Sequence, residues 1–447
     1  MPFSPIYGSK IVWELIAQGA DVNAQTKGGE TPLHKAVKCG DLSLVRFLLG
    51  CGADATIESG TGCTPVHMSL LDRDPRIASE LAKHVEEPDI YVAAALGRVR
   101  LMHTILKNNL QAARQAGPLF NMNALHFAAI RGQRNAVELL IREGAPIDSR
   151  DALGRTPLHC AALNDNVSCA KLLIFNEAPL NVRTGCEGCS IRKLTPLQQA
   201  ALAASKRTAE AIAAESGWDA LSAAALGKTN ELAAMLAKDS ALAAGNVDKT
   251  GVTPLHAASK SGELETVRLL LQKGVSSGAK DTSGRTALQA ATAHGRAGVV
   301  RVLLQAGADP DRSDTNGKSG LHVAAEEGYA EVVSILLKFG ADPSKTYHGA
   351  SSLFVAARRG NVEVVQVLLA AGVSANGIPK GKVPPLYSAI KWGHMEVVKE
   401  LVAAGADVNA CFLNGWRPLD EALRYDRGAI ARYLLRRGAV LGADDSK

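Results

Sequence analysis

The chain contains few aromatic residues, which make up 4% of its 447 positions. Cores of globular proteins depend on Phe, Tyr and Trp for much of their buried area, so we expect small aliphatic side chains to pack against each other instead. Hydrophobic residues still reach 47% and charged residues 21%, which argues against wholesale disorder. These values predict a folded chain built from thin, repeated layers.

The sequence also lacks the segments that direct a chain into or across a membrane. No stretch approaches the roughly 18 uninterrupted apolar residues that span a bilayer, and residues 1–23 show no basic region followed by an apolar run. Eight cysteines are scattered mostly singly, as in proteins that keep their thiols reduced. We therefore expect a cytoplasmic protein without membrane insertion.

One segment recurs along the chain, mostly at steps of 33 residues. TPLHKAVKCGDLSLVRFLLGCGAD at residues 31–54 returns, among other copies, as TPLHAASKSGELETVRLLLQKGV, SGLHVAAEEGYAEVVSILLKFGAD and PPLYSAIKWGHMEVVKELVAAGAD. Thr31 and Pro32 are typical of a helix start and Gly40 of a helix end, and a second helix with apolar residues at helical spacing follows. The third residue of each copy serves as an anchor, and the anchors are Leu33, Val66, Ile90, Leu125, Leu158, Leu197, Ala220, Leu255, Leu288, Leu321, Leu353, Leu386 and Leu419.

These copies resemble the ankyrin repeat family, whose TPLHxAAxxG and LLLxxGAD patterns they repeat almost verbatim. The resemblance covers residues 1–445 as thirteen anchored units and a partial N-terminal unit. It implies an all-α repeat solenoid of stacked helix-turn-helix units, with β-hairpin fingers that line a concave groove together with the first helices. One small unit cannot bury its faces alone, so the array is expected to be stable only as a stack.

Two steps in the array are short. The anchors Val66 and Ile90 lie 24 residues apart and Leu197 and Ala220 lie 23 apart, so each step lacks about the length of one finger. Asp89 and Asp219 are predicted to cap the helices that follow. We expect a single array divided at these junctions into sub-blocks 1–87, 88–217 and 218–445. A repeated offset of about 130 residues between the two junctions also indicates an internal duplication.

Motifs for catalysis are missing from the sequence. Neither a phosphate-binding GxxxxGK[ST] loop nor HExxH occurs. Six of the eleven histidines occupy the TPLH position, where the resemblance implies a structural hydrogen bond within the turn. We therefore expect no enzyme activity and no cofactor.

One loop, between the anchors Leu158 and Leu197, is six residues longer than usual and contains Cys186 and Cys189. A CxxC pair supplies half of a tetrahedral zinc site or a redox pair. The remaining ligands would have to come from Cys160, expected on the concave side of the preceding helix, and from Cys169 or His159. An inserted loop tip is the simpler interpretation, and a regulatory zinc or redox site is the alternative.

Variable positions at the C-terminal end combine basic and aromatic residues, which are enriched at the energetic centres of protein interfaces. They lie in the predicted fingers and at the ends of first helices. We predict that this patch binds a partner, and its residues are Tyr347, Arg358, Arg359, Lys391, Trp392, Trp416, Arg417, Arg424 and Tyr425.

The formal net charge of +6 is a mild basic excess for this length. The predicted loops carry a larger excess of basic residues than the whole chain, which favours a partner with an acidic surface. The sequence thus predicts a monomeric, non-catalytic scaffold or adaptor that binds a protein through its concave groove. Nucleic-acid binding through the basic loops is a further alternative, disfavoured because aromatic residues interleave with basic ones only near the C-terminus.

Overall fold

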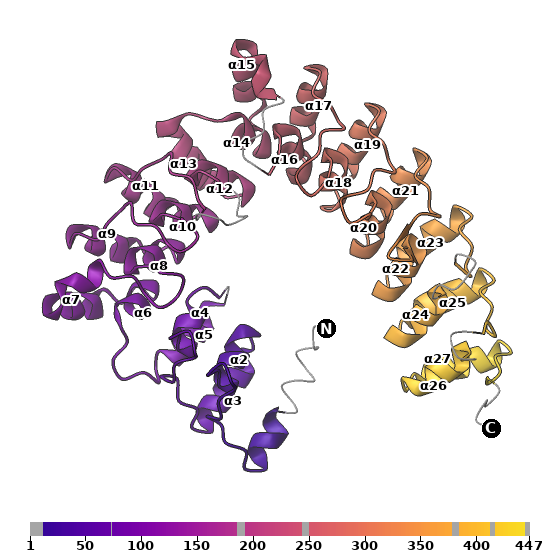
Figure 1. The fold of residues 1–447 in the computed structure, drawn as a ribbon, viewed down its shortest axis with the longest axis horizontal. Helices are drawn as coiled ribbons and strands as arrows, with labels where there is room; N and C mark the ends of the chain where they lie inside the picture. Colours follow the sequence, from indigo (N-terminus) through magenta and orange to yellow (C-terminus); the bar gives the residue numbers. More distant parts are fainter. Residues whose placement is uncertain are drawn as a thin grey trace. The chain divides into compact units, whose positions relative to one another are not determined.

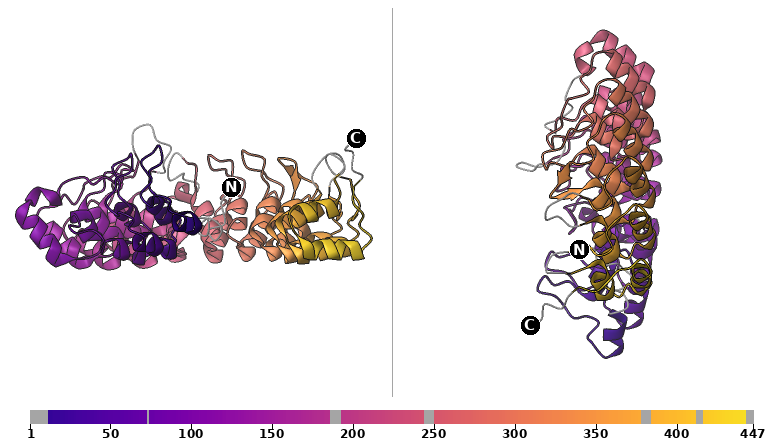
Figure 2. Two further views of the ribbon diagram at one scale, coloured as in Figure 1. Left: turned by 90° about the horizontal axis from the view of Figure 1, so that it is seen from below. Right: turned by 90° about the vertical axis from the view of Figure 1, so that its right-hand side faces the viewer.

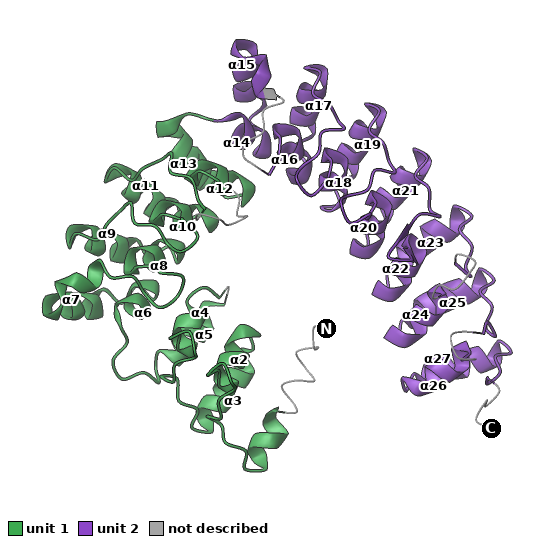
Figure 3. Cartoon of the chain, viewed as in Figure 1, with its two compact units in different colours: residues 1–218 green, residues 219–447 purple. Residues whose placement is uncertain are grey.

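A computed structural model describes residues 12–72, 74–185, 193–243, 250–377, 384–411 and 416–442. The chain forms two compact units, residues 1–218 and 219–447 (Figure 3). The predicted all-α architecture of stacked helix pairs is confirmed in each of them (Figure 1). The sub-block boundaries at 87/88 and 217/218 remain predictions.

Unit 1 begins with a helical segment at residues 12–17. Its further helices are α2 (Pro32–Lys38), α3 (Leu42–Gly50), α4 (Pro65–Ser69), α5 (Pro75–Leu81), α6 (Ile90–Ala95), α7 (Val99–Asn108), η1 (Leu110–Ala113), α8 (Ala124–Ile130), α9 (Arg134–Arg142), α10 (Pro157–Leu163), α11 (Val167–Phe175), α12 (Pro196–Leu202) and α13 (Lys206–Ser216).

Unit 2 repeats the same pattern. Its elements are α14 (Ala220–Ala225), α15 (Thr229–Lys238), η2 (Ser240–Ala243), α16 (Pro254–Ser261), α17 (Leu264–Gln272), α18 (Ala287–Thr292), α19 (Ala297–Gln305), α20 (Gly320–Glu327), α21 (Ala330–Lys338), β1 (Thr346–Tyr347), β2 (Ala350–Ser351), α22 (Ser352–Arg359), α23 (Val362–Ala370), α24 (Pro385–Trp392), α25 (Met395–Ala403), α26 (Pro418–Arg424) and α27 (Gly428–Arg436).

Each unit has two helix layers. First helices pack on first helices, as α8, α10 and α12 do, and second helices pack on second helices, as α9, α11 and α13 do. The connecting loops leave the helices on one side within each unit (Figure 2). The buried side chains are mainly Ala, Val, Leu and Ile, which agrees with the low aromatic content. In the part of the chain described, no helix combines the length and apolar character needed to cross a bilayer.

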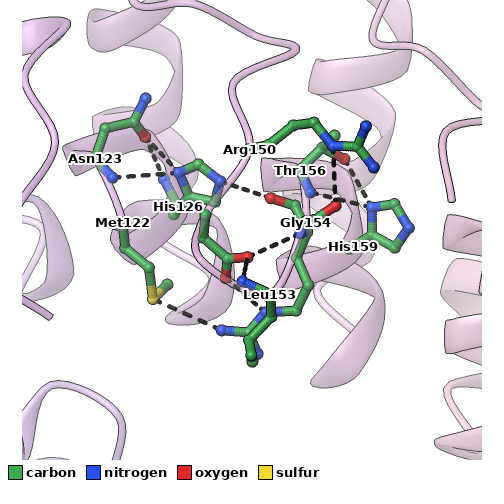
Figure 4. A network of polar contacts seen from close by, with 10 residues as sticks. Met122, Asn123, His126, Arg150, Leu153, Gly154, Thr156 and His159 are labelled. Carbon is green, nitrogen blue, oxygen red and sulfur yellow. Dashed lines mark hydrogen bonds and ion pairs between the residues drawn. The ribbon is translucent and has the colours of Figure 1, made fainter. Parts of the chain in front are cut away.

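The histidine of the TPLH position joins neighbouring repeats. In the first such repeat, the backbone N–H of Thr31 donates to Nδ1 of His34 at 3.1 Å, so Nε2 carries the proton and donates to the carbonyl of Cys63 at 3.0 Å. His126 and His159 repeat this pattern (Figure 4). Burial lowers the pKa of His159 to about 4, which keeps its imidazole neutral. The structural role predicted for these histidines is confirmed.

The fingers are mostly hydrogen-bonded turns. Among the described residues, the two-stranded sheet β1–β2 is the only finger with strand pairing beyond isolated bridges. Successive fingertips are also linked, because the N–H of Ala152 donates to Phe120 O at 2.7 Å and that of Gly185 to Leu153 O at 2.8 Å. Gly154 has a φ of +71°, and a Cβ there would lie 2.4 Å from Gly185 O, so this close approach requires glycine.

The first junction without a finger lies between the anchors Val66 and Ile90. There a side chain, that of Asp89, replaces the finger carbonyl that accepts a hydrogen bond from the TPLH histidine in other repeats. His67 Nε2 lies 2.6 Å from Oδ2 of Asp89, whose other oxygen caps α6 by accepting from Val92 N. Asp219 caps α14 in the same way, so both predicted caps are confirmed. The offset of 130 is also visible in the elements, since η1 starts at Leu110 and η2 at Ser240.

Candidate partner-binding surface

Part of the predicted patch lies where the first helices of unit 2 end. Arg358 and Arg359 are in the last turn of α22, Lys391 is in the last turn of α24 and Arg424 in that of α26. A positive side chain at a helix C-terminus interacts favourably with the helix dipole. These basic side chains therefore stabilise the helices that carry them, even before a partner is bound.

The next repeat holds these helix ends in place. Asn361 Nδ2 donates to the carbonyls of Ala325 and Glu326, and His394 Nε2 donates to Arg358 O at 3.0 Å. Arg427 Nη2 donates to Lys391 O at 3.1 Å. Because the ends of α20, α22 and α24 are hydrogen-bonded across the repeat boundary, the backbone of this part of the patch is ordered in advance, which lowers the entropic cost of binding.

Arg358 and Arg359 share one half-buried carboxylate. Both guanidinium groups bond to Oε1 of Glu326, and Lys318 Nζ bonds to Oε2. Burial alone raises the pKa of Glu326, but hydrogen bonds from Lys318 and Arg359 outweigh this effect and lower it to about 2. The positive charge of this cluster is thus partly neutralised within the protein.

Four other predicted residues form a stacked row. Arg424 Cζ lies 5.1 Å from the ring centroid of Trp416 and 5.5 Å from that of Tyr425, and Lys391 Nζ lies 5.6 Å from Tyr425. Such cation–π contacts contribute about 0.5–1 kcal/mol each at exposed sites. The structure therefore brings Lys391, Trp416, Arg424 and Tyr425 together, and we call them the stacked row.

The remaining predicted residues do not take part in these stacking contacts. Trp392, next to Lys391 in the chain, is 56% exposed. Arg417 precedes α26 and uses its backbone N–H to bond Asp420 Oδ2 at 2.8 Å. Tyr347 is half-buried in β1, and Lys318 Nζ lies 5.8 Å from its ring centroid. Trp392 is therefore the exposed aromatic anchor nearest in sequence to the stacked row.

Sequence reasoning missed Glu326 and Lys318 as parts of the patch. Glu326 occupies the same repeat position as Arg358 and Lys391, five residues after the anchor. Side chains at one repeat position lie beside each other in the stack. The change from an acidic residue, Glu326, to a basic one, Arg358, at this position therefore indicated in the sequence that the two side chains could pair.

The earlier first helices expose little apolar surface. Phe127 of α8 is fully buried, and Ile130 and Leu163 are half-buried. The ring of Phe127 packs edge-on against Tyr91, with the ring centroids 6.1 Å apart, where α6 packs against α8. Phe127 therefore belongs to the core.

The proposed zinc ligands Cys186 and Cys189 lie outside the described residues. Cys160 is fully buried in α10, which packs between α8 and α12, instead of facing a concave surface. Burial raises the pKa of its thiol to about 12, which disfavours the thiolate that zinc requires. Among the residues that the structure describes, no three His, Cys, Asp or Glu side chains are grouped to hold a metal ion.

Cys160 is expected to resist alkylation in the native protein. Both its burial and its raised pKa oppose reaction, so native iodoacetamide labelling should be at least about 100-fold slower at Cys160 than at the exposed Cys39 and Cys51. Peptide mass spectrometry after timed labelling measures each rate, and a urea-unfolded sample is the control. Equal native rates would show that α10 opens readily and would keep Cys160 available as a ligand.

Comparisons with known proteins agree with the repeat geometry. A family model described as ankyrin repeats (3 copies) matches residues 90–184, 197–281, 220–314, 306–379 and 353–445. A second, described as ankyrin repeats (many copies), matches residues 15–69. Together these matches extend over most of the chain.

Similar proteins share only segments with this chain. Protein glp-1 of Caenorhabditis elegans is 28% identical over 185 residues, 37% of this chain and 14% of that protein. Neurogenic locus notch homolog protein 1 of Xenopus laevis is 35% identical over 184 residues, 41% of this chain and 6% of that protein. The crystal structure of an ankyrin repeat domain from Acinetobacter baumannii AYE has 32% identity and a TM-score of 0.40, covering 42% of this chain and 98% of that one. On the residues matched by the family models, and on its stacked helix pairs, this chain belongs to the ankyrin repeat family.

Proposed function

We propose that this chain is a non-catalytic, cytoplasmic scaffold or adaptor that binds an acidic surface of a protein partner through the C-terminal patch. Ankyrin repeats are generally protein-interaction modules, which supports a protein as the ligand. The observation that carries the proposal is the stacked row, together with the exposed Trp392 that follows Lys391 of this row in the chain.

The chemistry of the stacked row suits a carboxylate-bearing surface. A guanidinium that stacks on aromatic rings still presents N–H groups at its edge, and these match the two oxygens of a carboxylate. The rings hold the Arg424 side chain and so reduce the rotamer entropy lost on binding. Trp392 adds a large apolar surface that a partner can bury.

The alternatives receive less support. A nucleic-acid groove needs positive charge that is available to phosphates, but Arg358, Arg359 and Lys318 already share Glu326. A regulatory zinc or redox site would depend on Cys186 and Cys189, and Cys160 is poorly placed to complete it.

The double variant Trp392→Ala, Arg424→Ala tests this proposal. Loss of one hot-spot side chain costs about 2 kcal/mol or more, so the partner's affinity should fall at least about 30-fold. The full chain is immobilised, captured proteins are identified by mass spectrometry, and the affinity of the main partner is measured by interferometry. Arg437→Ala is the matched control, because Arg437 also stacks on an aromatic ring, that of Tyr433 at 5.3 Å, but on the second helix α27.

Unchanged binding by the double variant would contradict the proposed patch, provided that its circular dichroism matches the wild type. Capture that disappears after nuclease treatment would favour the nucleic-acid alternative instead. An equal loss in Arg437→Ala would indicate a general charge effect.

A further inference from the structure

The second-helix layer of unit 1 contains a groove that the proposed function does not use. It has a volume of about 790 Å³ and lies between α11 and α13. Its apolar lining includes Val167, Ile174 and Phe175 from α11 and Ala211 and Ala214 from α13. Phe175 is 84% exposed, which is unfavourable for a large apolar side chain unless something covers it.

Phe175 protrudes at a position where related helices carry small or polar residues. It is the last residue of α11, and the other nine-residue second helices end in Gly50, Arg142, Gln272, Gln305, Lys338, Ala370, Ala403 and Arg436. An exposed phenylalanine therefore has no role in the repeat pattern itself.

The hollow beside Phe175 has an equally local cause. Ala211 is the sixth residue of α13, and the sixth residue of the nine-residue second helices is larger in every case: Phe47, Leu139, Leu172, Leu269, Val302, Ile335, Val367, Glu400 and Tyr433. One surface thus carries both a protruding ring and a hollow lined by small side chains. A surface with both features is complementary to itself.

The charges around the groove are also self-complementary. Arg207 lies toward the N-terminal end of α13 and Glu215 toward its C-terminal end, while Lys171 and Glu210, of opposite charge, lie near the middle of α11 and α13. Equivalent helices of neighbouring repeats run in the same direction, so the groove has a basic end and an acidic end. Two copies related by a twofold axis would pair these ends reciprocally, whereas a parallel arrangement would oppose like charges.

We propose that this groove is a self-association surface, in which a second copy of the chain packs antiparallel. Phe175 of each copy enters the hollow beside Ala211 of the other, and Glu215 of each copy faces Arg207 of the other. The contact involves about three helical turns, so it belongs to the small, reversible class of interfaces. It differs from the monomer expected from the sequence and does not depend on the C-terminal patch.

Sedimentation equilibrium of the full chain tests the proposal. The weight-average mass of the wild type should rise from 46.8 kDa toward twice that value as the concentration increases from about 1 to 200 µM. Phe175→Lys should weaken dimerisation at least about 10-fold. Leu435→Lys, which removes a 55% exposed apolar side chain from the second helix α27, should change it less than about twofold. Circular dichroism checks that each variant is folded.

Charge reversal tests the antiparallel arrangement separately. Glu215→Arg and Arg207→Glu should each weaken the dimer, and the double variant should restore it because both pairs are re-formed with inverted sign. A wild type that stays at 46.8 kDa up to about 200 µM would overturn the proposal. So would dimerisation that is insensitive to Phe175→Lys, or that is lost in Leu435→Lys, or a double variant no stronger than the single ones.

Discussion

Replacing Asp151 with alanine is expected to lower the free energy of unfolding of its repeat by about 3–5 kcal/mol, since it leaves a buried guanidinium without its counter-charge. Oδ1 of Asp151 accepts from the backbone N–H groups of Leu153 and Arg155, and Oδ2 accepts from Arg155 Nε at 2.6 Å. The Asp151 side chain is fully buried and that of Arg155 is 14% exposed. The carbonyl of Arg155 also accepts from His126, so the loss should extend to the preceding repeat.

The equivalent aspartates of two other fingers, Asp281 and Asp314, provide matched controls for Asp151→Ala, because the ion pair is less buried in the first and absent in the second. Asp281 makes the same contacts with Arg285, but that guanidinium is 49% exposed, so Asp281→Ala should cost less. Asp314 is half-buried and caps its turn, while Lys318, at the position of Arg155, bonds to Glu326 instead. Asp314→Ala should therefore cost only about 1 kcal/mol, the value of its turn hydrogen bonds.

Long repeat arrays do not unfold in two states, so the measurement must be local. Amide hydrogen exchange of peptides from α8 and α10 reports the opening free energy on both sides of Asp151. Urea unfolding followed by circular dichroism gives the global value. Equal losses of stability in Asp151→Ala and Asp314→Ala would show that the ion pair between Asp151 and Arg155 adds no stability beyond the hydrogen bonds of the turn.

The repeat made most of the fold predictable, because the same local signals occur in every copy. Thr31, Pro32 and Gly40 specify one helix, and thirteen versions of that signal specify the stack. The caps Asp89 and Asp219 were predictable for the same reason, since a cap depends on residues three positions away. The additional bond of Asp89 to His67 was not, because it depends on how closely the chain packs across 22 residues.

The candidate sites were predictable only in composition. The sequence contains the basic and aromatic residues of the C-terminal patch, but their pairing follows from side-chain rotamers: Arg424 stacks on Trp416, whereas Arg358 and Arg359 turn to Glu326. The α11–α13 groove was missed because it results from two deviations in neighbouring repeats, Phe175 and Ala211, each unremarkable alone. A comparison of equal positions between adjacent repeats would have found it.

Replacing Phe127 with alanine is expected to destabilise unit 1 by about 3–5 kcal/mol, the usual cost of removing a buried phenylalanine ring. Phe127 is among the largest fully buried side chains described. Its edge-on contact with Tyr91 adds about 0.5–1.5 kcal/mol beyond the buried area. Tyr91 in turn donates its hydroxyl to Ala116 O at 3.0 Å, so the cavity should also loosen the loop before α8.

Phe175→Ala is the matched control, because it removes the same ring from a position that is 84% exposed. At about 1 µM, where the proposed self-association is negligible, it should change stability by less than about 0.5 kcal/mol. Hydrogen exchange of α6 and α8 should therefore accelerate in Phe127→Ala and stay unchanged in Phe175→Ala. If both variants were equally stable, the repeats would have to close around the missing ring. Capture of a partner by the C-terminal patch should survive Phe127→Ala, because repeats stabilise their immediate neighbours and the patch begins more than 200 residues later in the chain.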